Sequence, residues 1–146
     1  ECGLFVSVLD DREELVAEMP AAVTRETGLS APEFIAQHPW QADEAIVIVS
    51  RNHELDREAL ASALQTSGAG YIGMIGSRRK VRHVFDLLRA RGVPDSALGR
   101  VHAPIGLDIG ADSPAEIAVS ALAEILAVLR GKSGRNMGNL SAAGGS

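Results

Sequence analysis

Short apolar runs that alternate with amphipathic stretches constrain the fold of this chain more than any other feature. The clearest run, Ala45–Val49, reads AIVIV; it is rich in β-branched residues and too short for a helix. Leu4–Leu9 (LFVSVL) and Tyr71–Ile75 (YIGMI) have the same character. Each run ends in polar or glycine-containing sequence, which is typical of a strand in a parallel sheet. We therefore predict three strands.

Helical patterns follow two of these strands. Apolar residues recur at helical spacing from Leu55 to Leu64, with Asp56 placed as an N-cap or first-turn acid. Gly76-Ser77 opens a second helix that ends at Gly92. Two more helices are predicted from their starting residues: a short one from Ser30, Pro32 and Glu33 to Gln37, and one from the capping box Ser113-Pro114-Ala115-Glu116 to Arg130. Residues 117–129 are apolar almost all round, which predicts burial on more than one side.

Strands that alternate with helices at this spacing imply parallel pairing through right-handed crossovers. We therefore predict a doubly wound α/β fold with a Rossmann-like parallel sheet over residues 1–131. The sheet is apparently truncated at its N-terminus, because the first strand begins almost at once. Residues 132–146 are rich in glycine and serine without a period, and they predict a disordered tail.

Composition excludes several classes of protein. The 146 residues carry 14 Lys plus Arg against 19 Asp plus Glu, a net charge of −5, with 3% aromatics, which argues against nucleic-acid binding. No apolar run reaches the roughly 18 residues of a membrane span, and no signal peptide is visible, so we expect a cytoplasmic protein. The single Cys2 cannot form an intrachain disulfide. The four histidines lack ligand spacing, and no nucleophile elbow or Walker loop occurs, so we expect no metal site and no catalytic residue.

The most pointed candidate site is the start of the helix after YIGMI, because ligands of parallel sheets bind at the carboxyl ends of the strands. If Ser77 caps this helix, Arg78, Arg79 and Lys80 crowd the positive end of its dipole, where each costs roughly 0.3–1 kcal/mol. A bound anion such as phosphate would reverse that cost. The alternative interpretations are a solvated basic face or a contact with an acidic protein.

Three other strand ends carry candidate residues, each with an alternative structural role. Asp10, near Arg12, is placed to bind ribose hydroxyls, although the matching glycine fingerprint upstream is not in the sequence; the alternative is a solvated strand end. Asn52 and His53 lie in a polar loop after AIVIV, where His53 titrates near neutrality or serves as a hydrogen-bonding residue. Residues 104–110, PIGLDIG, form either a ligand loop or a tight structural turn.

Four stretches resemble the C-terminal Rossmann domain of the XdhC/CoxI family: YIGMIGSRRK at 71–80, HAPIGLDIGADSPAEIAVSALAEI at 102–125, LDDRE at 9–13 and NHELDREAL at 52–60. The resemblance implies an accessory protein rather than an enzyme. Such a protein binds the molybdenum cofactor, as molybdopterin or its dinucleotide form, supports its sulfuration and delivers it to an apo molybdenum hydroxylase such as xanthine dehydrogenase. A cysteine desulfurase is a further implied partner. The family's glycine-rich first strand and turn are not in this sequence.

The cofactor-binding residues expected on this basis are Asp10, Arg12, Asn52, His53, Gly73, Gly76, Ser77, Arg78, Arg79, Lys80, Gly106 and Asp108. We expect phosphate or pyrophosphate at residues 77–80, and the pterin or ribose portion near Asn52, His53 and Asp108. The alternatives are an NAD(P)-binding oxidoreductase or dinucleotide-sensing regulatory domain, and an interaction module that binds no small molecule. Uncovered sheet surface also predicts a homo-oligomer.

Overall fold

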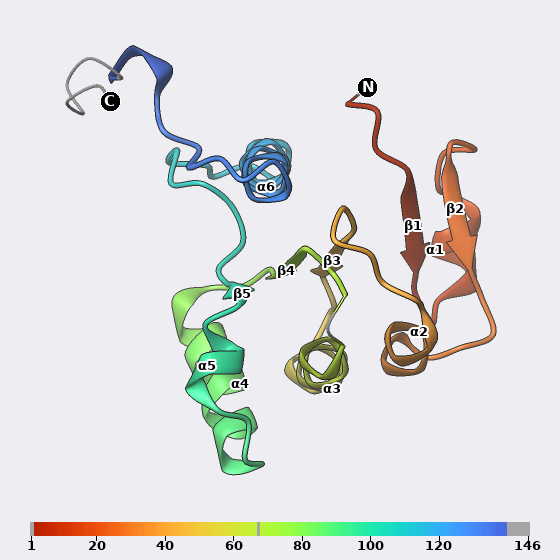
Figure 1. The fold of residues 1–146 in the computed structure, drawn as a ribbon. Coiled ribbons are helices and arrows are strands. Elements are labelled where there is room, and N and C mark those ends of the chain that lie inside the picture. The colour runs from red at the N-terminus through yellow and green to blue at the C-terminus, as the bar shows by residue number, and fades with distance from the viewer. Residues whose placement is uncertain (1, 67, 140–146) are drawn as a thin grey trace.

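A computed structural model describes residues 2–66 and 68–139, and Figure 1 shows their arrangement. The strands are β1 (Val6–Leu9), β2 (Val23–Glu26), β3 (Ala45–Ile48), β4 (Tyr71–Met74) and β5 (Val101–His102). The helices are α1 (Glu13–Ala17), α2 (Ala31–Gln37), α3 (His53–Gln65), α4 (Arg78–Ala90), α5 (Asp95–Leu98) and α6 (Pro114–Leu129), followed by a 3₁₀ turn, η1 (Met137–Asn139).

All strand pairs are parallel, but they form two separate ladders. β1 pairs with β2, with Val6 opposite Val23. β3, β4 and β5 form the second ladder, in which Ile46 lies opposite Ile72 and Gly73 opposite His102. Figure 1 shows the strands in the order β2, β1, β3, β4, β5 across the molecule. The predicted α/β class with a parallel sheet is confirmed, and the sheet is interrupted between β1 and β3.

The core lies between the larger ladder and the helices on one of its faces. Ile46 and Ile48 of β3, each 5% exposed, point into it. They meet apolar side chains from the neighbouring strand and helices: Leu60, Ala63, Ile72, Met74, Val81, Val84 and Leu88. α2, α3 and α4 cover this face, and α6 lies on the opposite face (Figure 1). The crossovers therefore place helices on both faces, as a doubly wound fold requires.

The predicted helix starts are confirmed at three places. Ser30 and Ser113 form capping boxes with Glu33 and Glu116, and Ser77 accepts a hydrogen bond from the Lys80 amide. The N-cap alternative for Asp56 was wrong, because Asn52 caps α3 by accepting the Leu55 amide at 2.8 Å. The other alternative is confirmed: Asp56 is an acid of the first turn of α3, and its side chain is buried.

Several short elements were not predicted. β2, α5 and β5 lie in stretches rich in turns, and α1 follows β1 directly. β5 has only two residues, which gives no detectable period. The expectation that residues 117–129 are buried on more than one side is confirmed for residues 120–129, which are all buried or half-buried, and is wrong at the start of the range, where Val119 is 62% exposed.

The predicted tail lies partly within the described residues. Residues 132–138 are exposed and end in η1, while residues 140–146 lie outside the described part of the chain, so their disorder stays a prediction. No helix in residues 2–66 and 68–139 is both long and apolar enough to cross a bilayer.

Candidate functional site

Polar loops from four parallel strands meet at the carboxyl edge of the sheets. The loops after β3 and β4 are joined where Ile75 N donates to Ile48 O at 3.0 Å. The loops after β4 and β5 are joined where Ile105 N donates to Met74 O at 3.1 Å. The starts of α3 and α4 lie at this edge because each helix follows its strand within a few residues. The structure thus brings together the loops that the sequence analysis identified as candidates.

Two arginines at the start of α4 have no side-chain partner among the residues that the structure describes. Ser77 caps the helix, with its hydroxyl 3.2 Å from the Lys80 amide. Arg78 and Arg79 are exposed, and neither makes an ion pair or side-chain hydrogen bond within the part of the chain that the structure describes. No acidic residue occupies the first turn. This end of α4 therefore combines the positive end of a helix dipole with two unpaired guanidinium groups.

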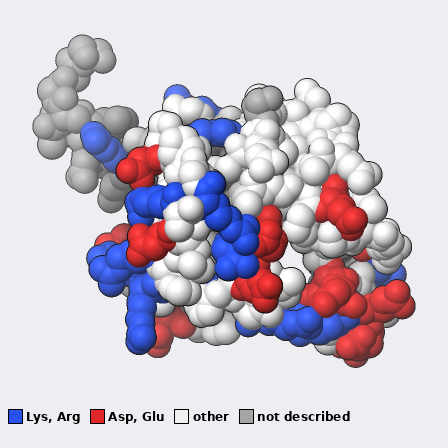
Figure 2. All heavy atoms as spheres, turned by 90° about the horizontal axis from the view of Figure 1, so that it is seen from below, with Lys and Arg blue, Asp and Glu red and all other residues white. Residues whose placement is uncertain are grey.

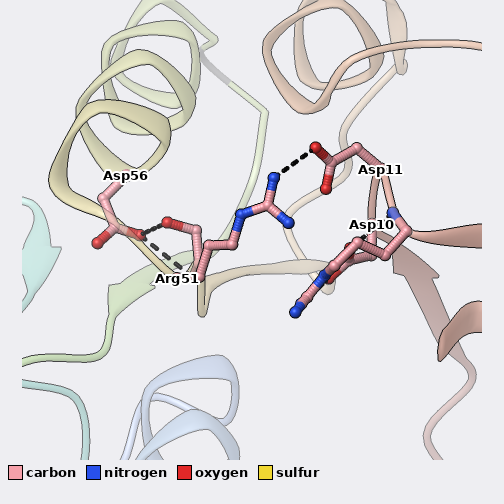
Figure 3. A network of polar contacts seen from close by, with 6 residues as sticks. Asp10, Asp11, Arg51 and Asp56 are labelled. Atoms are coloured by element: carbon pink, nitrogen blue, oxygen red, sulfur yellow. Dashed lines mark hydrogen bonds and ion pairs between the residues drawn. The ribbon is translucent and has the colours of Figure 1, made fainter.

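The third cation of this turn has a different role. The Lys80 ammonium lies against Asp56 Oδ2 and donates to Ile75 O at 3.3 Å. Asp56 is 0% exposed, and its other oxygen accepts hydrogen bonds from the Ser50 amide at 3.2 Å and hydroxyl at 2.6 Å (Figure 3). Lys80 is thus occupied with a buried carboxylate that ties α3 to α4, so we leave it out of the ligand-binding set.

Position 76 needs a glycine because the Lys80 side chain runs directly past its Cα. Its φ of +150° lies outside the range that side-chain-bearing residues readily adopt, and an added Cβ would lie 2.7 Å from Lys80 Cδ. The glycine expected to approach a ligand therefore gives room to the lysine that reaches Asp56. Gly73 has a similar packing role, because a Cβ there would lie 2.7 Å from the Tyr71 hydroxyl.

The end of β1 carries a closed ion pair. Arg12 donates to both carboxylate oxygens of Asp10, at 2.8 and 2.7 Å, and the hydrogen bonds from Arg12 hold the pKa of Asp10 well below its usual range. A second ion pair crosses the break between the ladders, from Arg51 after β3 to Asp11 at 2.7 Å (Figure 3). A ribose would therefore compete with Arg12 for the Asp10 carboxylate.

Two exposed histidines lie side by side near the starts of α3 and α4. The Asn52 side-chain oxygen is occupied as the helix cap, so that its amide nitrogen is the group left for a ligand. His53 is exposed, and its ring lies edge-on to that of His83 on α4, with the centroids 5.7 Å apart. His83 was not predicted as a site residue. It lies one turn beyond Arg79, which brings His53 to the same helix end as the free arginines.

The loop after β5 is anchored from α6. Glu124 accepts hydrogen bonds from the Gly106 amide at 3.1 Å and from the buried Tyr71 hydroxyl at 2.6 Å. Burial and the Glu124 carboxylate raise the pKa of Tyr71 well above its usual range. The Ser120 hydroxyl donates to Leu107 O at 2.6 Å, which fixes the next turn. The exposed Asp108 follows this anchored turn and is the one predicted residue of this loop whose side chain faces solvent.

Although the chain as a whole carries a net charge of −5, its basic and acidic side chains gather on different parts of the surface. Figure 2 shows basic side chains gathered on the side of the molecule where α4 lies, while acidic side chains gather on the side of β1 and α1. α4 contributes Arg78, Arg79, Lys80, Arg82 and Arg89 to this basic surface. An anion approaching the carboxyl edge would therefore meet its positive potential at the start of α4.

Parallel strands in two ladders, joined by crossover helices that lie on both faces, define an α/β domain of the Rossmann type. More specifically, residues 1–125 match the XdhC Rossmann domain, and the chain belongs to this family. The family resemblance seen in the sequence is confirmed.

Three similar proteins extend the comparison. "Uncharacterized protein YqeB" of Escherichia coli (strain K12) is 41% identical over 128 residues, 86% of this chain and 23% of that protein. A probable xanthine dehydrogenase subunit of Bacillus subtilis (strain 168) is 29% identical over 94 residues, 64% of this chain and 26% of that protein. A crystal structure described as a xanthine dehydrogenase from Bacillus halodurans shares the fold, with a TM-score of 0.71 and 24% identity over 89% of this chain and 37% of that one. The chain thus spans about a quarter of the curated relatives.

Proposed function

We propose that this domain binds the molybdenum cofactor and takes part in the maturation of a xanthine dehydrogenase-type molybdenum hydroxylase. Membership of the XdhC Rossmann domain family supports the proposal, as does the name of the Bacillus subtilis relative. In this role the domain is a carrier that supports cofactor sulfuration and insertion. Its partners are the apo hydroxylase and a cysteine desulfurase.

The observation that carries the proposal is the pair of exposed arginines at the start of α4. Arg78 and Arg79 find no acidic partner among the described residues, whereas Lys80 in the same turn has Asp56. Molybdopterin ends in a phosphate, which guanidinium groups bind through forked, charge-assisted hydrogen bonds. The residues present therefore fit the phosphate end of the cofactor. When bound, the cofactor supplies the molybdenum centre, while this chain binds and orients it.

The remainder of the cofactor would extend along the carboxyl edge. Asn52 retains a free amide nitrogen, His53 is exposed beside His83, and Asp108 points to solvent from an anchored loop. Donors and acceptors of this kind match the polar edge of a pterin. Asp10 joins the site only if a ligand displaces Arg12 from its carboxylate.

Calorimetry with isolated molybdopterin tests the assignment. We expect the double variant Arg78→Ala/Arg79→Ala to weaken binding at least tenfold, about 1.4 kcal/mol, while the circular dichroism spectrum is unchanged. Arg100→Ala, which removes an exposed arginine outside the carboxyl edge, is the matched control and should bind normally. Unaltered affinity of the double variant would refute the site.

The alternative is an NAD(P)-binding domain, which the acidic residue at the end of β1 favours. Calorimetry with NAD and NADP, run beside the molybdopterin titration, separates the two functions. Binding of either dinucleotide in the absence of molybdopterin binding would favour the alternative. Binding of none of the three would leave the basic surface of α4 as a contact for an acidic protein.

A further inference from the structure

We propose that Asp108 selects the heterocycle of the ligand by accepting a pair of hydrogen bonds from an aminopyrimidinone edge. Such an edge carries an exocyclic amino group beside a ring N–H, and it occurs in pterins and in guanine. The inference rests on the proposed function and deepens it, because it names the part of the ligand that the loop after β5 binds.

The Asp108 carboxylate is exposed and has no partner among the residues that the structure describes. The two acidic side chains of the following helix, α6, are both occupied. Glu124 accepts a hydrogen bond from the Tyr71 hydroxyl, and Glu116 accepts hydrogen bonds from backbone amides at the start of α6. Asp108 is therefore the acid of this region that is left for a ligand.

The backbone on either side of Asp108 is fixed. The Leu107 amide donates to Ser120 O at 3.3 Å, and Leu107 O accepts from the Ser120 hydroxyl at 2.6 Å. The Ile109 amide, on the other side, donates to Leu107 O at 3.0 Å. A side chain on a backbone that is already ordered loses less conformational freedom on binding. The loop can therefore present the carboxylate in a defined direction.

An exposed apolar side chain follows the carboxylate in the sequence. Ile109 is 55% exposed, which is unusual for a large apolar residue next to an anchored turn. A flat heterocycle has an apolar face as well as a polar edge. Sites for such ligands combine apolar side chains with a few placed polar groups. Asp108 and Ile109 provide one group of each kind.

The loop lies next to the arginines that we assign to the phosphate. β5 pairs with β4, and the Ile105 amide donates to Met74 O at 3.1 Å. α4, which begins with Arg78 and Arg79, follows β4 at the same edge. A ligand that binds the arginines through its phosphate would therefore extend onto the loop that carries Asp108.

The chemistry of a carboxylate determines which edge it can bind. An ionised carboxylate only accepts hydrogen bonds. It matches an edge with two neighbouring N–H donors, in the forked geometry of carboxylate–guanidinium pairs. The carboxamide of nicotinamide and the edge of adenine each place an acceptor beside the donor, so one carboxylate oxygen would face a lone pair. Asp108 therefore favours an aminopyrimidinone over either ring of NAD.

The test compares a pterin with the matching lumazine, in which a carbonyl replaces the amino group. 6-Carboxypterin and 6-carboxylumazine are titrated separately into the chain, and the backbone amide NMR signals of Leu107, Asp108 and Ile109 report binding. We expect the pterin to bind at least roughly tenfold more tightly, because the lumazine carbonyl would face a carboxylate oxygen. Asp108→Asn should reverse the preference, since a side-chain amide offers the acceptor and the donor that the lumazine edge requires.

The matched control is Asp112→Asn, which removes the same charge from an exposed residue of the same loop. It should keep the preference for the pterin. Both substitutions are at exposed positions, so the unfolding midpoint should not move. Equal affinity of the original chain for the two heterocycles would overturn the proposal. An unchanged preference in Asp108→Asn, or a reversal in Asp112→Asn, would overturn it as well.

Two further titrations identify the source of the edge and separate this inference from the proposed function. Guanosine monophosphate carries the same edge on a purine, and the tighter binder of this nucleotide and the pterin identifies the source, with the role of Asp108 supported in either case. Molybdopterin is titrated in parallel. If it binds but the heterocycles are not distinguished, the role of Asp108 fails and the proposed function stands. If it does not bind but the pterin is preferred, the proposed function fails and the role of Asp108 stands.

Discussion

The Lys80 ammonium lies against the carboxylate of Asp56, a side chain that is fully buried where α3 meets α4. The carboxylate also accepts two hydrogen bonds from Ser50, so one buried charge joins the end of β3 to two helices. A basic residue in the first turn of α4 is thereby stabilised by the fold itself. Only its two arginine neighbours remain for an external anion.

Removing one partner of this pair should destabilise the fold strongly. We expect Asp56→Ala to lower the free energy of unfolding by about 3–5 kcal/mol, because the lysine loses its partner in a largely buried position. Asp56→Leu/Lys80→Met should recover much of this loss. Urea unfolding followed by the fluorescence of Trp40, the single tryptophan, measures both changes. Arg89→Ala, which breaks only exposed ion pairs, is the control and should have a much smaller effect.

Alanine substitutions at two glycines should distinguish the cost of backbone strain from the cost of lost packing. Gly106 (φ +106°) and Gly110 (φ +70°) both adopt positive φ, but only at Gly106 would an added Cβ collide with the Ser120 side chain. Gly110→Ala should therefore cost about 1 kcal/mol of unfolding free energy from strain alone. Gly106→Ala should cost clearly more, because the Ser120 anchor of the loop must also move. Equal thermal shifts for the two variants would contradict this account.

The ionisation of Tyr71 can be observed directly, because it is the only tyrosine. Its pKa is raised from 10.0 by burial and by the Glu124 carboxylate, so the neutral form is favoured in the folded state. Stability from this group is complete below pH 10 and is lost as the pH rises further, because the unfolded chain ionises first. Absorbance at alkaline pH should thus show tyrosinate only upon unfolding. Glu124→Gln should bring the tyrosine pKa closer to 10.0.

Asp10 should titrate far below an ordinary aspartate. Hydrogen bonds from Arg12 lower its pKa from 3.8, so its contribution to stability is present above about pH 4 and is lost as the pH falls. We expect the carboxyl carbon shift of Asp10 to stay that of a carboxylate at pH 3 in carbon-detected NMR. In Arg12→Ala the same signal should titrate near its usual pKa. Arg100→Ala should leave it unchanged.

β1, β3, β4 and the long helices were predictable because their signals are local. The run AIVIV has no helical alternative at its length, and the serine caps of α2, α4 and α6 follow from side-chain chemistry within four residues. The family resemblance rested on the same segments, and the match over residues 1–125 confirms it. β2 and β5 escaped prediction because they depend on pairing with strands distant in sequence.

The candidate site was predictable only as a set of loops. Parallel topology predicts that the loops meet at one edge of the sheet. It does not predict which side chains of those loops pair with one another. Asp11 and Arg51 are 40 residues apart, and nothing in either segment indicates that they form an ion pair. The same holds for Asp56 and Lys80, whose pairing changes the role predicted for the lysine. The role of Glu124 could not be predicted either, since a single acidic residue on an apolar helix does not indicate which loop it binds.

The bridge between Arg51 and Asp11 has a consequence for how the two ladders move. Both side chains are substantially exposed, at 44% and 64%, so dissolved salt screens their attraction. Raising the ionic strength should weaken this link at the carboxyl edge, while the packing of α2 on α3 still joins the two halves of the domain. At high salt the β1–β2 ladder would then be attached to the rest of the domain through that helix contact alone at this boundary, so hydrogen exchange near Asp11 and Arg51 should depend on salt concentration.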